Sequence, residues 1–407
     1  MKKNRTRFHR IVYKVFRPVV WIWLRTKMRF DFSTQPTLPD QFLLISNHVT
    51  NFDPFLLGLA TRRLIYYVAT EHIFSLGWLT KLIVWLVDPI PRPKAGQAAG
   101  TVLEIKRRLK SGASVGLFAE GNCSWDGRTA SFSASTGKLV RTAGVPLVTC
   151  RIRGGYLSSP RWADYTRRGT VTVEVTHIWQ PEELRALRPE EINRLIAEGI
   201  AEDAYATRDE QQALYPGKNR AEGIENALFV CPRCHAFGQF SGKGNRFACT
   251  CGLTGEVGQD GSITAEGLSF TTMKDWEDFQ QEYLQALDPS AYPTVSDPDL
   301  KLSRIEDHVR HEISQGTLIF SPTALTLGDF SVPVSEMTDL AVRLKGIVTF
   351  SVRDGAYYEI KPIRGKKSYH GRKYFLLFHH LKNKEETAAA PPAAASQQKE
   401  SEHDNRQ

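Results

Sequence analysis

The chain has 407 residues, which is longer than a single hydrophobic core usually supports, so we expect two or three domains. Hydrophobic residues make up 41% of it and charged residues 24%, a composition that excludes a wholly disordered chain and a polytopic membrane protein. The formal net charge is +9, so the protein favours an anionic partner such as a lipid headgroup or a nucleic acid.

The positive charge is concentrated in residues 1–30, which contain no acidic residue. The basic residues there are Lys2, Lys3, Arg5, Arg7, Arg10, Lys14, Arg17, Arg25, Lys27 and Arg29. Large aliphatic side chains and two tryptophans alternate with these cations, a pattern typical of a basic amphipathic helix at a membrane interface. We therefore expect this segment to bind an anionic membrane surface. An amphipathic helix that packs only on its own domain is the alternative.

The same segment is a poor candidate for a membrane span or a signal peptide. Its uncharged run, residues 18–24, is much shorter than the roughly 20 apolar residues that a transmembrane helix needs. No small-residue cleavage site follows the run, so a cleaved leader is not expected either.

Residues 31–215 alternate short apolar runs with helical periodicity, which predicts an α/β domain. The predicted strands are residues 41–46, 64–69, 114–118, 146–152 and 170–176. One predicted helix begins at residue 55, and three others span residues 73–86, 102–110 and 181–205. The last of these closes the domain.

The chain beyond residue 215 has a different pattern. Residues 225–260 contain two close cysteine pairs among Gly-rich turns and predict a metal ribbon. Residues 300–382, including the run KYFLLFHH, predict a small β domain with basic loops that loosely resembles a pleckstrin-homology-like domain. This domain either binds lipid headgroups or only stabilises the rest of the protein, and the sequence leaves both roles open. Residues 385–407 are predicted to be disordered, because they hold too little apolar surface to fold.

The densest chemical signal is the segment SNHVTNFDP, residues 46–54, directly after a predicted strand. His48 and Asp53 are five positions apart and would point in different directions on a regular helix. A turn that enters a helix would instead let the Asp53 carboxylate bend back toward the imidazole. The carboxylate would then fix the tautomer of His48, and the other ring nitrogen could take a proton from a hydroxyl.

This segment resembles the Asn-His-x4-Asp signature of the 1-acylglycerol-3-phosphate acyltransferase family, and the resemblance covers about residues 10–205. It implies an O-acyltransferase with His48 as general base, Asp53 as its orienting partner, and Asn47 in the substrate site. It also implies acyl-CoA or acyl-carrier protein as the donor and a lysophospholipid such as 1-acylglycerol-3-phosphate as the acceptor.

Three further blocks match the family in order and spacing. The apolar segment that ends in DPIPRPK places Arg92 where a cation helps to hold the acceptor phosphate. The block LFAEGNCS resembles the family's Phe-Pro-Glu-Gly-Thr-Arg-Ser, and the block GVPLV resembles a strand that lines the acyl-donor site. The residues that these two blocks assign to the substrate site are Glu120, Gly121, Ser124 and Pro146.

The block LFAEGNCS departs from the family at two positions. Ala119 replaces a proline, and Cys123 stands where the family has its phosphate-binding arginine. A thiol cannot supply that positive charge, so either Arg128 binds the phosphate or the acceptor is not a simple glycerol phosphate. We expect Cys123 to be a bystander rather than a covalent nucleophile.

Four cysteines form two tight pairs with fourteen residues between the pairs: Cys231, Cys234, Cys249 and Cys251. Thiolates at this spacing predict a closed, structural zinc site and indicate a reducing compartment. We therefore expect the protein to lie peripherally on the cytoplasmic face of a membrane. Because zinc ribbons also bind nucleic acid, the alternative is a non-catalytic membrane- or nucleic-acid-binding ribbon protein. The few cations near the ribbon make nucleic acid the less favoured partner.

Overall fold

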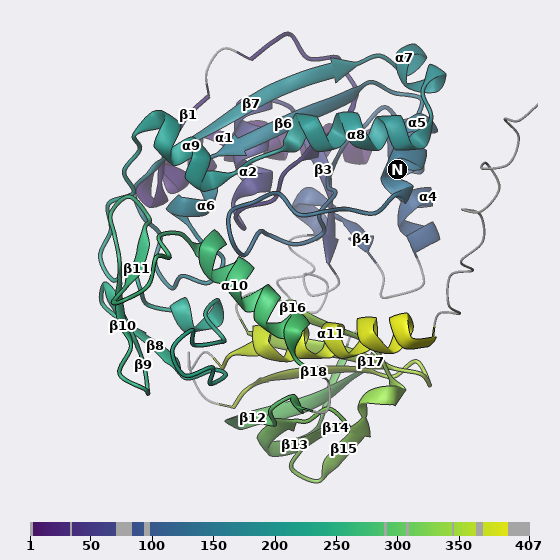
Figure 1. Cartoon of the computed structure of the whole chain (residues 1–407). Helices are drawn as coiled ribbons and strands as arrows, with labels where there is room; N and C mark the ends of the chain where they lie inside the picture. The colour runs from purple at the N-terminus through teal and green to yellow at the C-terminus, as the bar shows by residue number, and fades with distance from the viewer. Residues whose placement is uncertain are drawn as a thin grey trace, which may run out of the picture.

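The structure, a computed structural model, describes residues 3–32, 35–70, 84–92, 98–288, 291–306, 309–343, 346–363 and 369–389. These residues form an α/β domain, a four-stranded ribbon and a C-terminal β domain, which pack together (Figure 1). The predicted fold class, α/β followed by a cysteine ribbon and a mostly-β region, is confirmed.

The N-terminal domain is built on a seven-stranded sheet of order β1-β7-β6-β2-β5-β3-β4. Its strands are β1 (Arg29–Asp31), β2 (Leu43–Ser46), β3 (Ile65–Thr70), β4 (Ile90–Arg92), β5 (Ser114–Phe118), β6 (Leu147–Arg153) and β7 (Thr170–Trp179). Every neighbouring pair is parallel except β6 and β7. The strands β2, β3, β5 and β6 therefore all end at one edge of the sheet, the carboxyl edge, and all begin at the opposite one, the amino edge.

Helices cover both faces of this sheet, as a buried parallel sheet requires. One face packs against α1 (Lys3–Lys27) and α2 (Asp53–Thr61). The other face packs against α4 (Ala98–Lys110), α5 (Ser135–Arg141), α7 (Pro181–Ala186) and α8 (Pro189–Ile200). None of the helices in the described ranges is both long and apolar enough to cross a membrane.

The predicted helix over residues 181–205 is wrong in its continuity, because the chain forms α7, α8 and α9 (Ala204–Gln211) there. Arg188 is extended, as expected of a residue that precedes a proline, so Pro189 starts a new helix. Asp203 then caps α9 by accepting hydrogen bonds from two backbone N–H groups. Most of the predicted helix at 73–86 lies outside the described residues, and residues 84–87 are helical.

The ribbon packs directly on the N-terminal domain. Its strands are β8 (Phe240–Lys243), β9 (Arg246–Cys249), β10 (Thr254–Val257) and β11 (Ile263–Ala265), in the order β11-β10-β9-β8, and a short 3-10 helix, η2 (Ile224–Asn226), precedes them. Phe240 and Phe247 share one hydrophobic cluster with Tyr156 and Trp162 of the first domain. The helix α10 (Met273–Ala286), which the sequence did not predict, adds Trp276 to the same cluster.

The C-terminal β domain is a seven-stranded antiparallel sheet of order β15-β14-β13-β12-β18-β17-β16. The elements are β12 (Val295–Glu306), β13 (Val309–Phe320), β14 (Ala324–Leu327), β15 (Phe330–Pro333), η4 (Val334–Glu336), β16 (Met337–Arg343), β17 (Ile347–Val352), β18 (Tyr357–Pro362) and α11 (Gly371–Ala389). The β-rich region is thus confirmed, and its pleckstrin-homology-like character stays a prediction.

The predicted strand KYFLLFHH is wrong, because these residues belong to α11. Tyr374, Leu377, Phe378 and Leu381 recur at helical spacing, and all four are buried in the core of the β domain. The helix continues to Ala389, beyond the start of the predicted disordered tail. The rest of that tail, residues 390–407, lies outside the described residues.

Candidate active site

The turn between β2 and α2 brings His48 and Asp53 together at the carboxyl edge of the sheet. The Nδ1 atom of His48 lies 2.7 Å from Oδ2 of Asp53. The same oxygen accepts hydrogen bonds from the backbone N–H groups of Val49 (2.7 Å) and Thr50 (2.9 Å), and Oδ1 accepts from the Thr50 hydroxyl at 2.7 Å. Asp53 is fully buried, so these donors fix its position before any ligand arrives.

The His48 imidazole lies between an aromatic ring and a sulfur atom. The Phe118 ring stacks on it, with 4.1 Å between ring centroids and 16° between ring planes. The Cys123 sulfur lies 3.5 Å from Nδ1 and 3.4 Å from Nε2. A sulfur in the ring plane could not be equally distant from both nitrogens without colliding with the carbon between them, so Sγ faces the ring. The in-plane direction of Nε2 therefore points to neither Phe118 nor Cys123.

Electrostatics favour the protonated form of this histidine. Burial of the ring opposes protonation, but the Cys123 sulfur and the hydrogen-bonded Asp53 carboxylate outweigh it and raise the pKa of His48. With Nδ1–H donated to Asp53, Nε2 is the nitrogen that can accept a proton. In its neutral form the pair can act as a general base, and the same groups that raise the pKa stabilise the imidazolium formed by the transfer.

Glu120, directly after β5, ties the catalytic turn to the neighbouring loop. Its Oε1 accepts a hydrogen bond from the backbone N–H of His48 (2.7 Å), and its Oε2 accepts one from Ala130 (2.6 Å). Burial raises the pKa of Glu120 to about 7, although both hydrogen bonds oppose this shift. Gly121 has φ = 75°, a conformation that glycine adopts without strain. The sequence-based role of these two residues in acceptor binding stays a prediction.

Ser124 and Arg128, which the sequence assigned to the substrate site, already have protein partners. The Ser124 hydroxyl donates to the carbonyl oxygen of Arg128 (2.7 Å) and accepts from the N–H of Gly127 (2.9 Å). The Arg128 guanidinium forms ion pairs with Asp126 and Asp278, each at 2.6 Å. Arg128 is thus neutralised by two carboxylates, which argues against it as the replacement for the family's phosphate-binding arginine.

Asn47 is a positioning residue. Its side chain is buried and pairs with the backbone of Ile152, donating to the carbonyl oxygen at 2.9 Å and accepting from the N–H at 2.7 Å. This pairing extends the contact between β2 and β6 beyond the end of β2 and holds the peptide before His48. The amide therefore has its hydrogen bonds within the protein.

Two other predicted substrate residues lie at opposite edges of the sheet. Pro146 precedes β6 and accepts a hydrogen bond from the N–H of Leu43 (2.9 Å), so it lies at the amino edge, opposite His48. This position separates Pro146 from the catalytic turn, and the expectation that its strand lines the acyl-donor site stays a prediction. Arg92 ends β4 at the carboxyl edge, and its side chain lies outside the described part of the structure.

Sequence reasoning missed the residues that hold the Cys123 loop from outside the motif. Arg161 donates hydrogen bonds to the carbonyl oxygens of Cys123 (3.1 Å) and of Val342 in the β domain (2.7 Å). Its guanidinium lies 4.3 Å from the centre of the Trp125 ring, and that of Arg372 lies 4.7 Å from the same ring. The C-terminal part therefore buttresses the loop beside His48. No sequence signal marked these contacts, because they join residues far apart in the chain.

The four ribbon cysteines converge as predicted. Their sulfur atoms all lie within 4.8 Å of one another, with 3.7 Å between Cys231 and Cys251 and 3.9 Å between Cys234 and Cys249. Zn–S bonds of about 2.3 Å in a tetrahedron would place the sulfurs roughly 3.8 Å apart. These separations fit a tetrahedral ion and are far too long for disulfide bonds. The cluster can therefore hold a soft metal ion.

The comparison with protein-family models agrees with the sequence motifs. Residues 29–153 match the family model described as Acyltransferase. No curated protein matches the chain significantly. Among solved structures, the chain is similar to the 1-acyl-sn-glycerophosphate (LPA) acyltransferase PlsC from Thermotoga maritima, with 19% identity and a TM-score of 0.40. That likeness covers 52% of this chain and 84% of the other.

Proposed function

We propose that the protein transfers a fatty acyl group from a thioester to a hydroxyl of a lysophospholipid, with His48 and Asp53 as the catalytic pair. The match of residues 29–153 to the family model described as Acyltransferase supports this proposal. The observation that carries the proposal is the 2.7 Å contact between Nδ1 of His48 and the buried Asp53 carboxylate. This contact leaves Nε2 as the proton acceptor. The donor is acyl-CoA or acyl-carrier protein, and the acceptor is a member of the lysophospholipid class to which 1-acylglycerol-3-phosphate belongs.

The reaction needs no covalent enzyme intermediate. Nε2 of His48 accepts the proton of the acceptor hydroxyl as its oxygen attacks the thioester carbonyl carbon. The tetrahedral oxyanion then collapses, the carbon–sulfur bond breaks, and the imidazolium returns the proton to the leaving thiolate. Asp53 keeps the ring in the required tautomer and stabilises the imidazolium between these two transfers.

The identity of the acceptor depends on the position of Cys123. This residue lies against His48, where the sequence resemblance places an arginine that binds phosphate. Since Arg128 is paired with Asp126 and Asp278, the loop supplies no obvious substitute cation. We therefore propose that the enzyme prefers a lysolipid other than the simple glycerol phosphates.

We further propose that the protein attaches peripherally to the cytoplasmic face of a membrane through α1. Seven large apolar side chains of this helix are between 40% and 61% exposed: Ile11, Val15, Phe16, Val19, Trp21, Ile22 and Trp23. Cations flank them along the same helix, which supports an anionic bilayer as the occupant of this face. Such attachment would bring the lysolipid to the enzyme within the membrane plane.

We propose structural zinc for the cysteine cluster. The four sulfur ligands and their separations suit a closed tetrahedral site, in which the ion would hold the two turns of the ribbon together. Metal analysis of the purified native protein should give one zinc per chain. A Cys249→Ser, Cys251→Ser variant should lose the metal, and full zinc retention by that variant would contradict the proposed site.

The catalytic proposal is tested by acyl transfer from acyl-CoA and acyl-carrier protein to a panel of lysolipids that includes lysophosphatidic acid. His48→Ala should lower the rate by roughly 10² to 10⁴. His311→Ala, which removes an exposed histidine of β13, is the matched control and should keep wild-type activity. If the folded wild type transfers nothing to any acceptor, the enzyme proposal fails and a membrane-bound scaffold becomes the better interpretation.

A further inference from the structure

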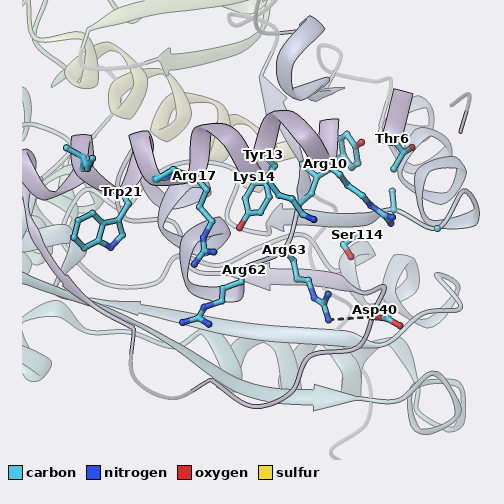
Figure 2. A pocket seen from close by; sticks show the side chains of 16 residues that line it. Thr6, Arg10, Tyr13, Lys14, Arg17, Trp21, Asp40, Arg62, Arg63 and Ser114 are labelled. Carbon is cyan, nitrogen blue, oxygen red and sulfur yellow. Dashed lines mark ion pairs between the residues drawn. The ribbon is translucent and has the colours of Figure 1, made fainter. Parts of the chain in front are cut away.

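A large cavity lies beneath α1, away from the proposed catalytic site. It has a volume of about 1040 Å³ and is lined by α1, by the end of α2 and by the residues just before β3 and β5 (Figure 2). His48 and Glu120 follow β2 and β5, whereas Leu64 and Ser114 lie at the beginnings of β3 and β5. Since these strands are parallel, the cavity lies at the amino edge, opposite the catalytic turn.

Cations converge on this cavity from two elements. Figure 2 shows three basic side chains of α1 above it and two from the end of α2 below it. The five are Arg10, Lys14, Arg17, Arg62 and Arg63. Asp40 is the single acid among the described lining residues, and it lies 3.5 Å from Arg63. In the part of the chain that the structure describes, the other four cations form no ion pair with a carboxylate.

The basic surface continues along α1. A second hollow of about 620 Å³ shares Trp21 and Ile22 with the first and adds Arg25, Lys27 and Arg168. Like charges gathered in a concave site repel one another, and a bound anion would relieve that repulsion. Arginine side chains in particular suit phosphate, whose oxygens accept paired N–H donors.

The position of the cations on α1 indicates where the phosphate would come from. Arg10, Lys14 and Arg17 recur every three or four residues and so lie on one flank of the helix. Ile11, Val15 and Val19 are each one or two positions further along and form the neighbouring exposed apolar face. A helix that places its apolar face among acyl chains would hold this basic flank at the level of the lipid headgroups.

We infer that the cavity beneath α1 is a second, non-catalytic binding site for a phosphate group, and that the phosphate belongs to the headgroup of an anionic phospholipid. The choice of a lipid source rests on the membrane attachment proposed above. The phosphate site itself does not, because it can be titrated in solution. The site is separate from acyl transfer, because its residues lie at the edge of the sheet opposite His48.

The test uses the full chain and a matched pair of double variants. Lys14→Gln with Arg62→Gln removes one cavity cation from α1 and one from the end of α2. Arg7→Gln with Lys138→Gln removes the same charge from α1 and from α5 at exposed positions outside the cavity. Binding of inorganic phosphate is measured by calorimetry. Binding to phosphatidylcholine vesicles with and without phosphatidylglycerol is measured by sedimentation.

We expect the cavity variant to bind phosphate about tenfold more weakly than wild type, and the control variant to change by less than about twofold, a difference of roughly 1 kcal/mol between them. The cavity variant should also lose most of the extra binding that phosphatidylglycerol confers. A loss of phosphate binding with unchanged vesicle binding would overturn the lipid source and identify a soluble phosphate compound. Equal changes in phosphate binding by the cavity variant and the control variant would contradict the proposed phosphate site.

The outcome is separable from the catalytic proposal. His48→Ala should bind phosphate and vesicles as wild type does, whether or not the wild type transfers acyl groups. If His48→Ala loses phosphate binding while the cavity variant keeps it, the measured anion binds at the catalytic edge and the inference about the cavity fails.

Discussion

The two edges of the N-terminal sheet differ in whether their described charged side chains have partners within the protein. At the carboxyl edge, the buried Asp53 carboxylate receives three hydrogen bonds from Val49 and Thr50 in addition to its contact with His48. At the amino edge, Arg10, Lys14, Arg17 and Arg62 face a cavity that has one acid, Asp40, among its described lining residues. The Asp53 carboxylate at the first edge has its hydrogen bonds without a ligand, whereas among the described residues of the second edge the cations outnumber the acids.

This difference separates two kinds of site. Catalysis by a general base needs groups held in place before the substrate arrives, so the protein itself satisfies the Asp53 carboxylate. A binding site for an anion needs charge that the protein leaves unneutralised. Substitution of Asp53 at the carboxyl edge should therefore impair both rate and stability, while substitution of the cavity cations at the amino edge should impair binding alone.

Asp53→Asn should give the largest effect. The amide loses the negative charge that stabilises the imidazolium, so we expect the acyl-transfer rate to fall by about 10² to 10⁴. The weaker acceptor should also lower the free energy of unfolding by about 1 to 3 kcal/mol. Kinetics and urea denaturation measure the two effects. Asp40→Asn, at the amino edge, is the control and should change neither. Wild-type activity in a folded Asp53→Asn variant would contradict the catalytic role.

Cys123→Ala should have a smaller effect, visible in the pH profile. The Cys123 sulfur raises the pKa of His48, so its removal should lower that pKa. Because only the neutral imidazole can accept a proton, the acid limb of the kcat/KM profile should move to lower pH. At a fixed pH on that limb, the rate should rise by about tenfold for each unit of pKa change.

Cys150→Ala, which removes a buried cysteine of β6, is the control for this substitution and should leave the profile in place. Loss of transfer at every pH in Cys123→Ala alone would show that the thiol takes part covalently. That outcome would contradict the expectation that Cys123 is a bystander in the transfer.

The contrast also explains which parts of the site the sequence could predict. His48 and Asp53 lie within one turn, and the four ribbon cysteines lie in two short pairs, so local spacing was enough for both. The Asn47 amide forms its hydrogen bonds with Ile152, 105 positions away. The Arg128 guanidinium forms one of its ion pairs with Asp278, 150 positions away. Nothing in local spacing reveals such partners, so both residues were assigned to the substrate.

Prediction of the fold from local sequence is limited in the same way. Five strands of the first domain, β2, β3, β5, β6 and β7, were located within a few positions, as β5 shows. The three-residue strands β1 and β4 were not predicted. The run KYFLLFHH is apolar on consecutive positions and fits either a strand or a buried helix, and its packing in the β-domain core decides for a helix. The cavity beneath α1 was also beyond reach, because Arg62 joins Lys14 there only through the packing of α2 against α1.

The smallest expected effect is on the stability of the Lys14→Gln, Arg62→Gln variant. In the described structure neither cation has a carboxylate partner, so their removal should leave the free energy of unfolding within about 0.5 kcal/mol of wild type. At low ionic strength it should rise slightly, because repulsion between the cavity cations is reduced, and added salt should erase the gain. Urea denaturation at two salt concentrations measures this, with Arg7→Gln, Lys138→Gln as the control. A loss comparable to that of Asp53→Asn would show that the cations stabilise the fold itself, and the two edges would then be alike.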